Sequence, residues 1–260
     1  MPTRTGYKPG VPCWVDLAST DLTVSVSFYQ ALFGWQVAFD SCADAGGYGR
    51  FTQRGRLVAG IGPTFGQDRP SVWNTYFSTG DAESVADKVK EAGGRVEVGP
   101  VQVFDEGTMA VFQDPAGASF TVWEPMRHHG AQLLDEPGAL CWSELASRDP
   151  MEARTFYAEV FGWGVRGVTG TAGVECTEWL ADGRPIAGMA PMGDRFPPQA
   201  PSQWLVFFAV ADCEVAARLA ERCGGKVLLP PRDAPMGRYA VLTDPRAAVF
   251  AVMTPRPPRA

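Results

Sequence analysis

Long apolar segments and an excess of basic charge are both missing from this chain of 260 residues. Its longest purely apolar run, 204–211, is far shorter than the roughly 20 residues that a membrane-spanning helix needs. The first ten residues contain no apolar core of the kind found in signal peptides. A formal charge of −6 disfavours binding to nucleic acid or to an anionic membrane surface. We therefore expect a cytoplasmic protein.

Histidine is also scarce, since the chain has two, His128 and His129. The six cysteines form no CxxC pair, and neither a GxSxG motif nor a phosphate-binding loop motif occurs. A Ser-His-Asp relay or a Cys/His zinc cluster needs several such residues brought together, so both are disfavoured. No catalytic partner of the two histidines can be recognised from spacing, and a solvated position is the simpler interpretation.

The most prominent feature of the sequence is an internal repeat. Residues 10–35 return as 138–163 with the same Cys-Trp, Leu-Ala-Ser, Phe-Tyr and Phe-Gly-Trp groups, 128 residues later. Repeats of this kind indicate tandem copies of one structural unit. The sequence therefore predicts an N-terminal arm (1–9), a first domain (10–125), a linker (126–137), a second domain (138–255) and a C-terminal tail (256–260).

Each half divides again, because a helix start recurs four times. Asp21, Asp81, Asp149 and Asp212 each precede a segment with apolar residues at helical spacing. Aspartate at such a position accepts a hydrogen bond from an otherwise unpaired amide of the first turn. A short β-rich run comes before each helix, and two or three more follow it. The sequence thus predicts an α+β fold of four βαβββ units.

These motifs resemble the vicinal oxygen chelate superfamily, which includes glyoxalase I, bleomycin-resistance proteins and extradiol dioxygenases. The resemblance rests on the D-x6-FY-x3-FGW helices at 21–35 and 149–163, the Gly-Gly pairs, and the Asp114-Pro115 and Asp244-Pro245 turns. It covers residues 10–254 and is strongest with a tandem-repeat actinobacterial branch of glyoxalase-like and hydroxylase proteins, some of them from antibiotic biosynthesis. It implies two tandem glyoxalase-like domains, in each of which two units close into a cup.

In that family a divalent metal is held in the cup by His or Gln on first strands and by Glu on later strands. The aligned positions carry other side chains here: Trp14, Gly60, Asn74 and Thr121 in the first half, and Trp142, Gly188, Leu205 and Ala251 in the second. None is the carboxylate or imidazole that a divalent cation prefers. We therefore predict no metal and no cofactor.

Acidic residues accompany the two tryptophans at the first-strand positions. Side chains two apart on a strand point the same way, so Asp16 should face the cup with Trp14, and Glu144 with Trp142. We predict Asp16 and Glu144 as catalytic acid/base groups. The predicted substrate-binding residues are Trp14, Trp73, Asn74, Tyr76, Trp142, Trp204 and Tyr239. The alternative is that the indoles fill the volume of a disused site.

Two functions remain open. The first is a metal-independent tailoring enzyme, hydroxylase-like or lyase-like, that acts on a bulky aromatic natural product. The second is a non-catalytic protein that binds or sequesters a drug, as in the bleomycin-resistance branch. A metal-dependent glyoxalase or dioxygenase is disfavoured by the ligand positions. The expected partner is a small hydrophobic or aromatic molecule, and the expected state is a monomer or weak homodimer, because one chain can close both cups.

Overall fold

The computed structural model describes residues 4–42, 46–64, 69–170, 173–193 and 196–256. Residues 1–3 of the predicted arm and 257–260 of the predicted tail lie outside the described residues. The first half contains β1 (Pro12–Ser19), α1 (Leu22–Phe33), β2 (Gln36–Phe39), β3 (Gly49–Gln53), β4 (Arg56–Pro63), β5 (Val72–Ser78), α2 (Ala82–Glu91), β6 (Arg95–Val103), β7 (Gly107–Gln113) and β8 (Ser119–Pro125). The second half contains β9 (Leu140–Ser147), α3 (Pro150–Phe161), β10 (Gly164–Thr169), β11 (Glu175–Ala181), β12 (Arg184–Pro191), β13 (Gln203–Ala209), α4 (Cys213–Arg222), β14 (Lys226–Ala234), β15 (Gly237–Thr243) and β16 (Val249–Pro255).

Each half forms one eight-stranded sheet. The strand order is β2-β3-β4-β1-β5-β8-β7-β6 in the first sheet, and β10-β11-β12-β9-β13-β16-β15-β14 in the second. The antiparallel pair β1–β5 joins the two units of the first half, and β9–β13 joins those of the second. The predicted α+β fold of four βαβββ units is confirmed. The units pair within each half of the chain.

The four aspartates predicted to begin the helices are confirmed as N-caps. The Asp21 side chain accepts a hydrogen bond from the Val24 amide, and Asp81, Asp149 and Asp212 accept equivalent bonds. The helices α1 and α3 are capped at their C-terminal ends by Gly34 and Gly162, whose φ angles of 72° and 71° lie in the left-handed region that glycine adopts without strain.

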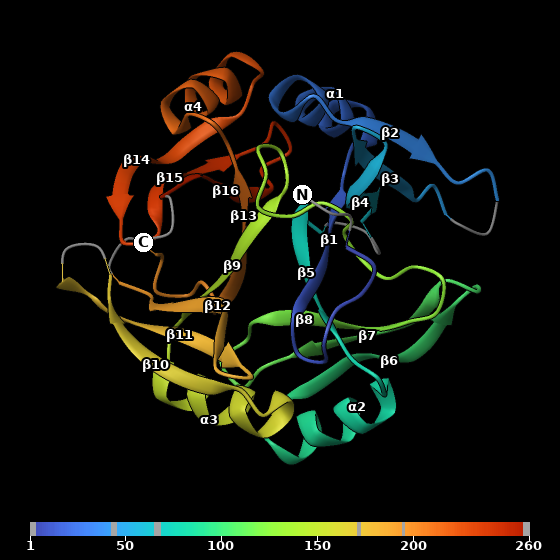
Figure 1. The fold of residues 1–260 in the computed structure, drawn as a ribbon, viewed down its shortest axis with the longest axis vertical. Helices are drawn as coiled ribbons and strands as arrows, with labels where there is room; N and C mark the ends of the chain where they lie inside the picture. Colours follow the sequence, from blue (N-terminus) through green and yellow to red (C-terminus); the bar gives the residue numbers. More distant parts are fainter. Residues whose placement is uncertain (1–3, 43–45, 65–68, 171–172, 194–195, 257–260) are drawn as a thin grey trace.

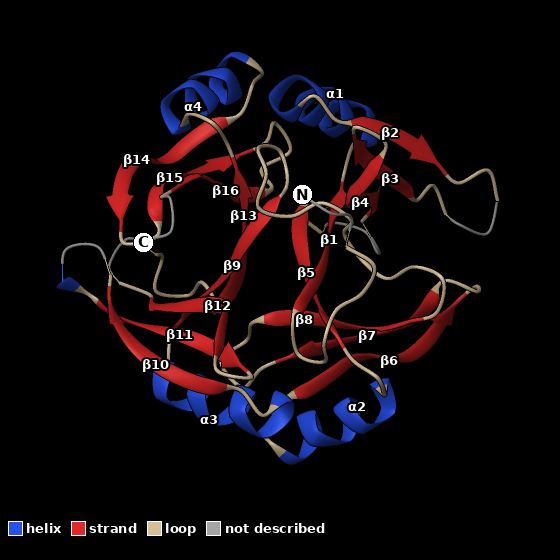
Figure 2. Cartoon of the chain, viewed as in Figure 1, coloured by secondary structure: helices blue, strands red, loops and turns tan. Residues whose placement is uncertain are grey.

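The helices pair across the two halves. Figure 1 shows α1 beside α4 at one end of the molecule and α2 beside α3 at the other, while the end strands of each sheet curve outward. Figure 2 shows the same division, with all four helices on the outside of the two sheets. Large side chains follow this pairing: Phe28 of α1 meets Phe250 of β16, and Phe120 of β8 meets Tyr157 of α3. The two halves therefore share two hydrophobic cores.

A hydrogen-bonded chain also crosses between the halves at one of these cores. Trp204 Nε1 donates to Tyr157 Oη at 2.9 Å, and that hydroxyl donates to Asp114 Oδ2 at 3.1 Å. Asp114 belongs to the Asp-Pro turn of the first half, and Tyr157 belongs to α3 of the second half. The Asp114 carboxylate is buried, so losing a donor leaves it short of a partner.

Replacing Tyr157 with phenylalanine is expected to lower the free energy of unfolding by about 1–3 kcal/mol, because Trp204 Nε1 and Asp114 Oδ2 both lose their partner. Urea denaturation checks this. The repeat supplies a matched variant, Tyr29→Phe, since Trp73 Nε1 donates to Tyr29 Oη at 2.8 Å. A loss below about 0.5 kcal/mol for both variants would contradict a stabilising role for the hydroxyls.

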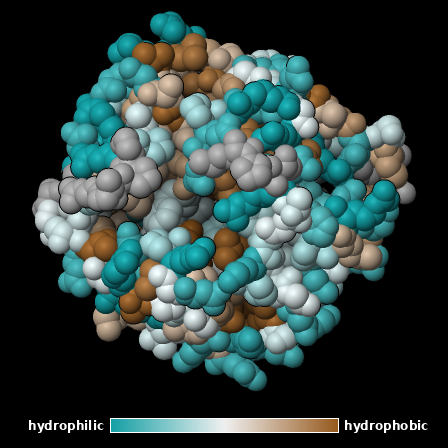
Figure 3. Space-filling model, viewed as in Figure 1, coloured by the Kyte–Doolittle hydropathy of each residue, from teal (hydrophilic) through white to brown (hydrophobic). Residues whose placement is uncertain are grey.

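No helix among the described residues is long and apolar enough to cross a membrane. On the face of the molecule shown in Figure 3, apolar groups lie scattered among hydrophilic ones.

Candidate functional site

The concave side of each sheet gathers most of the predicted site residues. We call the group around Asp16 the first cup and the group around Glu144 the second cup. Asp16 lies opposite Asn74 on β5, and Glu144 lies opposite Leu205 on β13. Both acids have a glycine on their other side, Gly60 on β4 and Gly188 on β12.

Three hydrogen-bond donors surround Asp16 in the first cup. Oδ2 of Asp16 accepts from Tyr76 Oη at 2.6 Å and from Tyr48 Oη at 3.3 Å, while Oδ1 accepts from Asn74 Nδ2 at 2.8 Å. Burial raises the pKa of the Asp16 carboxyl, and these three donors oppose that rise. Asp16 is 7% exposed. A buried carboxylate with every donor supplied by the protein suits a structural role.

The indole of Trp14 closes the same cup. Trp14 Nε1 donates to Tyr48 Oη at 3.1 Å, so Tyr48 links the indole to the acid. The His128 ring lies edge-on against Trp14 with ring centroids 4.6 Å apart, and its backbone carbonyl accepts from Trp123 Nε1 at 2.7 Å. The solvated position predicted for His128 is wrong, because the linker folds back and packs this histidine against the cup.

Protonation of His128 is disfavoured in the folded chain. Burial lowers its pKa to about 4, and Arg50 and His129 nearby add to the effect. The unfolded chain takes up this proton more readily, so the stability contributed by neutral His128 is present above about pH 6.5 and is lost as pH falls through about 4.

Replacing His128 with phenylalanine keeps a ring against Trp14 but removes this titration. The wild type is expected to lose about 2 kcal/mol more than the variant between pH 6.5 and pH 4, as measured by urea denaturation at both pH values. An equal loss in the two proteins would place His128 in solvent.

Trp73 and Trp204 do not join the cups. Each is a direct neighbour in sequence of a cup residue, so its side chain points to the opposite face of the sheet. There Trp73 and Trp204 pack in the two shared cores and donate to Tyr29 and Tyr157. The structure therefore assigns both to packing between the halves.

The second cup leaves its acid without a partner. No described residue makes a hydrogen bond or ion pair with the Glu144 carboxyl, and burial raises its pKa to about 7. The three donors of the first cup are replaced at the equivalent positions by Leu205 for Asn74, Phe207 for Tyr76, and Cys176 for Tyr48. Glu144 is half-buried rather than sealed. This carboxyl can both hold and release a proton near neutral pH.

The indole nitrogen of Trp142, Nε1, is buried and also lacks a hydrogen-bond partner among the described residues. A Cβ at Gly188 would lie 2.9 Å from this nitrogen and 3.2 Å from Glu144 Oε2. Both polar atoms therefore lie close to Gly188 and on the same side of the cup. Tyr239 completes an apolar wall with Phe207, their ring centroids 5.9 Å apart.

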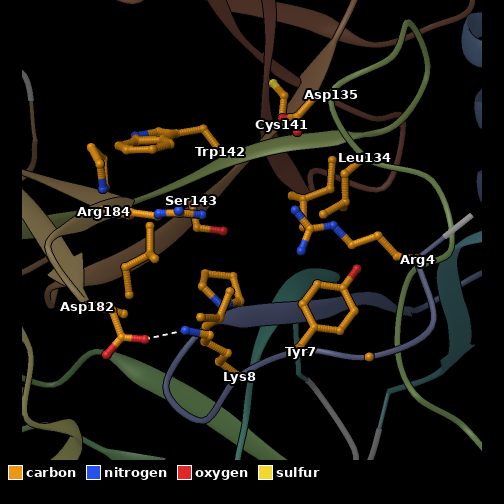
Figure 4. Close-up of a pocket in the computed structure, with 17 residues that line it drawn as sticks. Arg4, Tyr7, Lys8, Leu134, Asp135, Cys141, Trp142, Ser143, Asp182 and Arg184 are labelled. Carbon is orange, nitrogen blue, oxygen red and sulfur yellow. Dashed lines mark hydrogen bonds and ion pairs between the residues drawn. The ribbon is translucent and has the colours of Figure 1, made fainter. Parts of the chain in front are cut away.

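A cleft of about 400 Å³ adjoins Trp142. Figure 4 shows Trp142 on one side of it and the N-terminal arm, with Arg4, Tyr7 and Lys8, on the other. The Lys8–Asp182 ion pair ties the arm to the turn between β11 and β12. This volume lies within the range of small-molecule sites.

The residues of neither cup fit a divalent cation. Within the described parts of the chain, no three His, Cys, Asp or Glu side chains are grouped as metal ligands would be. In the first cup the Asp16 carboxylate is already occupied by three donors of the protein. In the second cup Glu144 faces the apolar Leu205 on β13, where a second ligand would be needed.

Comparison with known proteins identifies the family. The model of the Glyoxalase/Bleomycin resistance protein/Dioxygenase superfamily matches residues 13–122, and a glyoxalase-like domain model matches residues 142–253. The chain belongs to this superfamily, as the sequence motifs predicted.

Full-length relatives share much of the sequence. CFP32 of Mycobacterium tuberculosis, whose name carries the term glyoxylase, is 38% identical over 264 residues, which is 99% of each chain. The anthracycline biosynthesis protein DnrV of Streptomyces peucetius is 38% identical over 265 residues, covering 96% of this chain and 94% of that one.

Solved structures share the fold. The Mn(II)-bound glyoxalase from Novosphingobium aromaticivorans has a TM-score of 0.65 at 16% identity, covering 95% of this chain and 82% of that chain. The 2,3-dioxygenase LapB from Pseudomonas sp. KL28 has a TM-score of 0.62 at 14% identity, covering 98% and 97%. At these identities the similarity shows the fold alone.

Proposed function

We propose that the chain is a metal-independent enzyme that modifies a bulky aromatic molecule in its second cup, with Glu144 as the general acid/base. The observation that carries this proposal is the contrast between the two acids. Asp16 accepts three hydrogen bonds from its own cup, whereas Glu144 has none from the described residues. A polar group that is partly removed from water without a partner destabilises the fold, which a purely structural residue has no reason to do.

The titration of Glu144 suits proton transfer. A general acid/base works best when its pKa lies near the operating pH, and burial raises the pKa of Glu144 to about 7. A lyase-like reaction fits this group, because a base that takes a proton in one step and returns it in another needs no oxidant. Hydroxylation would require an oxidant as a further reactant. We therefore favour the lyase-like alternative.

The walls of the second cup favour an aromatic substrate. Trp142, Phe207 and Tyr239 offer ring faces and edges, on which a flat molecule can stack. The name of the relative DnrV refers to anthracycline biosynthesis, which supports an aromatic natural product as the substrate of this chain. Incubation with a panel of polycyclic aromatic compounds, followed by mass spectrometry, tests the proposal: products should form with the wild type and not with Glu144→Gln.

The second candidate is a protein that binds such a molecule without converting it. The apolar walls and the misfit to a metal favour this function as much as the first. The two differ in what Glu144 does, because a binding protein should form no product as the wild type and should keep its affinity in Glu144→Gln. Loss of binding in Trp142→Ala without any detectable product would favour this candidate. In either case we expect a monomer or weak homodimer, which light scattering can measure.

Removing divalent metal is expected to leave function unchanged, since the cup positions do not fit a metal. Dialysis against EDTA should change ligand affinity and turnover less than twofold, and elemental analysis of the purified chain should find well under one transition-metal atom per molecule. A stoichiometric metal whose removal lowers turnover tenfold or more would contradict metal independence.

A further inference from the structure

The repeat makes the first cup an internal template for what the second cup lacks. In the first cup the Tyr48 hydroxyl stands between two polar groups: it accepts from Trp14 Nε1 at 3.1 Å and donates to Asp16 Oδ2 at 3.3 Å. It lies above Gly60, where a Cβ would come within 2.0 Å of the Tyr48 oxygen. This glycine is what leaves room for the hydroxyl.

The second cup has an indole, an acid and a glycine at the equivalent positions but lacks the hydroxyl. Trp142, Glu144 and Gly188 correspond to Trp14, Asp16 and Gly60, but Cys176 stands where Tyr48 would be. Trp142 Nε1, buried and unpaired among the described residues, and Glu144 Oε2 both lie over Gly188, 2.9 Å and 3.2 Å from where a Cβ would stand. One donor and one acceptor therefore face the same point.

We propose that the second cup binds a phenolic hydroxyl group of its ligand above Gly188, where it accepts from Trp142 Nε1 and donates to Glu144. The proposal rests on the proposed function of this cup and names the substrate class, a hydroxylated aromatic compound. A hydroxyl satisfies both groups because it is at once a donor and an acceptor. An ammonium group would leave the indole unpaired, and a carboxylate would face Glu144 with the same charge.

The neighbouring side chains favour a ring next to this hydroxyl. Phe207 and Leu205 stand where Tyr76 and Asn74 stand in the first cup, so the polar donors there are replaced by apolar surface. Phe207 is buried and packs near Tyr239. A phenol entering the second cup thus repeats in another molecule what the first cup achieves with its own Tyr48.

The burial of Glu144 sets the expected pH dependence. Cys176 on β11 lies near Glu144, and Glu178 on the same strand lies opposite Gly188 and forms an ion pair with Arg166 on β10. Burial raises the pKa of Glu144 to about 7, and the carboxylate is the form that accepts from a neutral phenol. Affinity for the phenol should therefore increase as pH rises through about 7.

The test compares 2-naphthol with 2-methoxynaphthalene by calorimetry at pH 8, with the wild-type chain. The methoxy oxygen can accept from Trp142 Nε1 but cannot donate to Glu144. We expect 2-naphthol to bind at least tenfold more tightly. Equal affinities would overturn the hydroxyl site and leave the proposed function standing, since both probes would still occupy the cup. If neither probe binds, the hydroxyl site is overturned. The proposed function is then decided separately, by comparing product formation in the wild type and in Glu144→Gln.

A second test uses a variant of the protein that supplies the missing phenol from its own side chain. The Tyr48 ring packs against Gly62, where a Cβ would lie 3.1 Å from the ring, and Ala190 is the equivalent residue in the second half. We therefore combine Cys176→Tyr with Ala190→Gly, and use Cys176→Phe with Ala190→Gly as the matched control. The tyrosine variant should lose the preference for 2-naphthol and unfold at a higher temperature at pH 8 than the phenylalanine control. Equal unfolding temperatures would contradict the proposal.

Discussion

Replacing Glu144 with glutamine is expected to reduce turnover by about 10²–10⁴-fold and at the same time to stabilise the folded chain at pH 8. The two effects have one cause. The carboxyl is partly removed from water without a partner among the described residues, so its charged form is reactive and also costs folding free energy. Glutamine has a similar shape but neither charge nor titration.

The sign of the stability effect follows from the direction of the shift. Burial raises the pKa of Glu144 from 4.5 to about 7, so the unfolded chain releases this proton at lower pH than the folded chain does. The stability linked to protonated Glu144 is present below about pH 4.5 and is lost as pH rises through about 7. The wild type should lose about 2–3 kcal/mol relative to the variant over this range. Urea denaturation at pH 4.5 and pH 8 measures the difference.

Replacing Asp16 with asparagine is expected to have the opposite result: stability falls by about 1–3 kcal/mol, and turnover per folded molecule stays within about twofold. The asparagine NH₂ group would face donors from Tyr76, Asn74 or Tyr48, so at least one buried hydrogen bond is lost. Urea denaturation and a turnover assay on the same preparation check both parts. If Asp16→Asn has normal stability but no turnover, the reaction takes place in the first cup instead.

Local features of the fold were predictable because local chemistry determines them. Asp21, Asp81, Asp149 and Asp212 begin helices through bonds within three residues, and such bonds depend little on the rest of the chain. Because this helix start recurs four times, the βαβββ unit could be assigned four times along the chain. The sharing of cores between the halves was not predictable in this way, because Phe28 and Phe250 meet only after both sheets have formed.

The candidate site was predictable in part. Asp16 and Trp14, and likewise Glu144 and Trp142, share a cup, as the alternation of side chains along a strand predicts. The same alternation should have separated Trp73 from Asn74, which are adjacent on β5 and point to opposite faces. His128 was beyond sequence reasoning, since nothing periodic in the linker indicates where it folds back.

The difference between the two cups is visible in the sequence as substitutions between the repeats. Aligning the halves 128 residues apart places Tyr48 over Cys176. Tyr76 corresponds to Phe207, because Tyr76 pairs with Trp14 and Phe207 pairs with Trp142. Identities between the halves define the fold, whereas these substitutions decide which acid keeps its donors. The sequence motifs treat both acids as equivalent catalytic groups, whereas we propose a division of roles, in which Asp16 holds the first cup together and Glu144 is available to a ligand.

The measurement that tests this division most directly is the titration of the Glu144 side-chain carboxyl, followed by carbon-13 NMR in the wild-type chain and assigned by its absence in Glu144→Gln. If Glu144 lacks a partner, its titration midpoint is expected at about 7. A midpoint near the ordinary value of 4.5 would mean that water or another group satisfies this carboxylate, and it would contradict the assignment of the second cup as the reactive site.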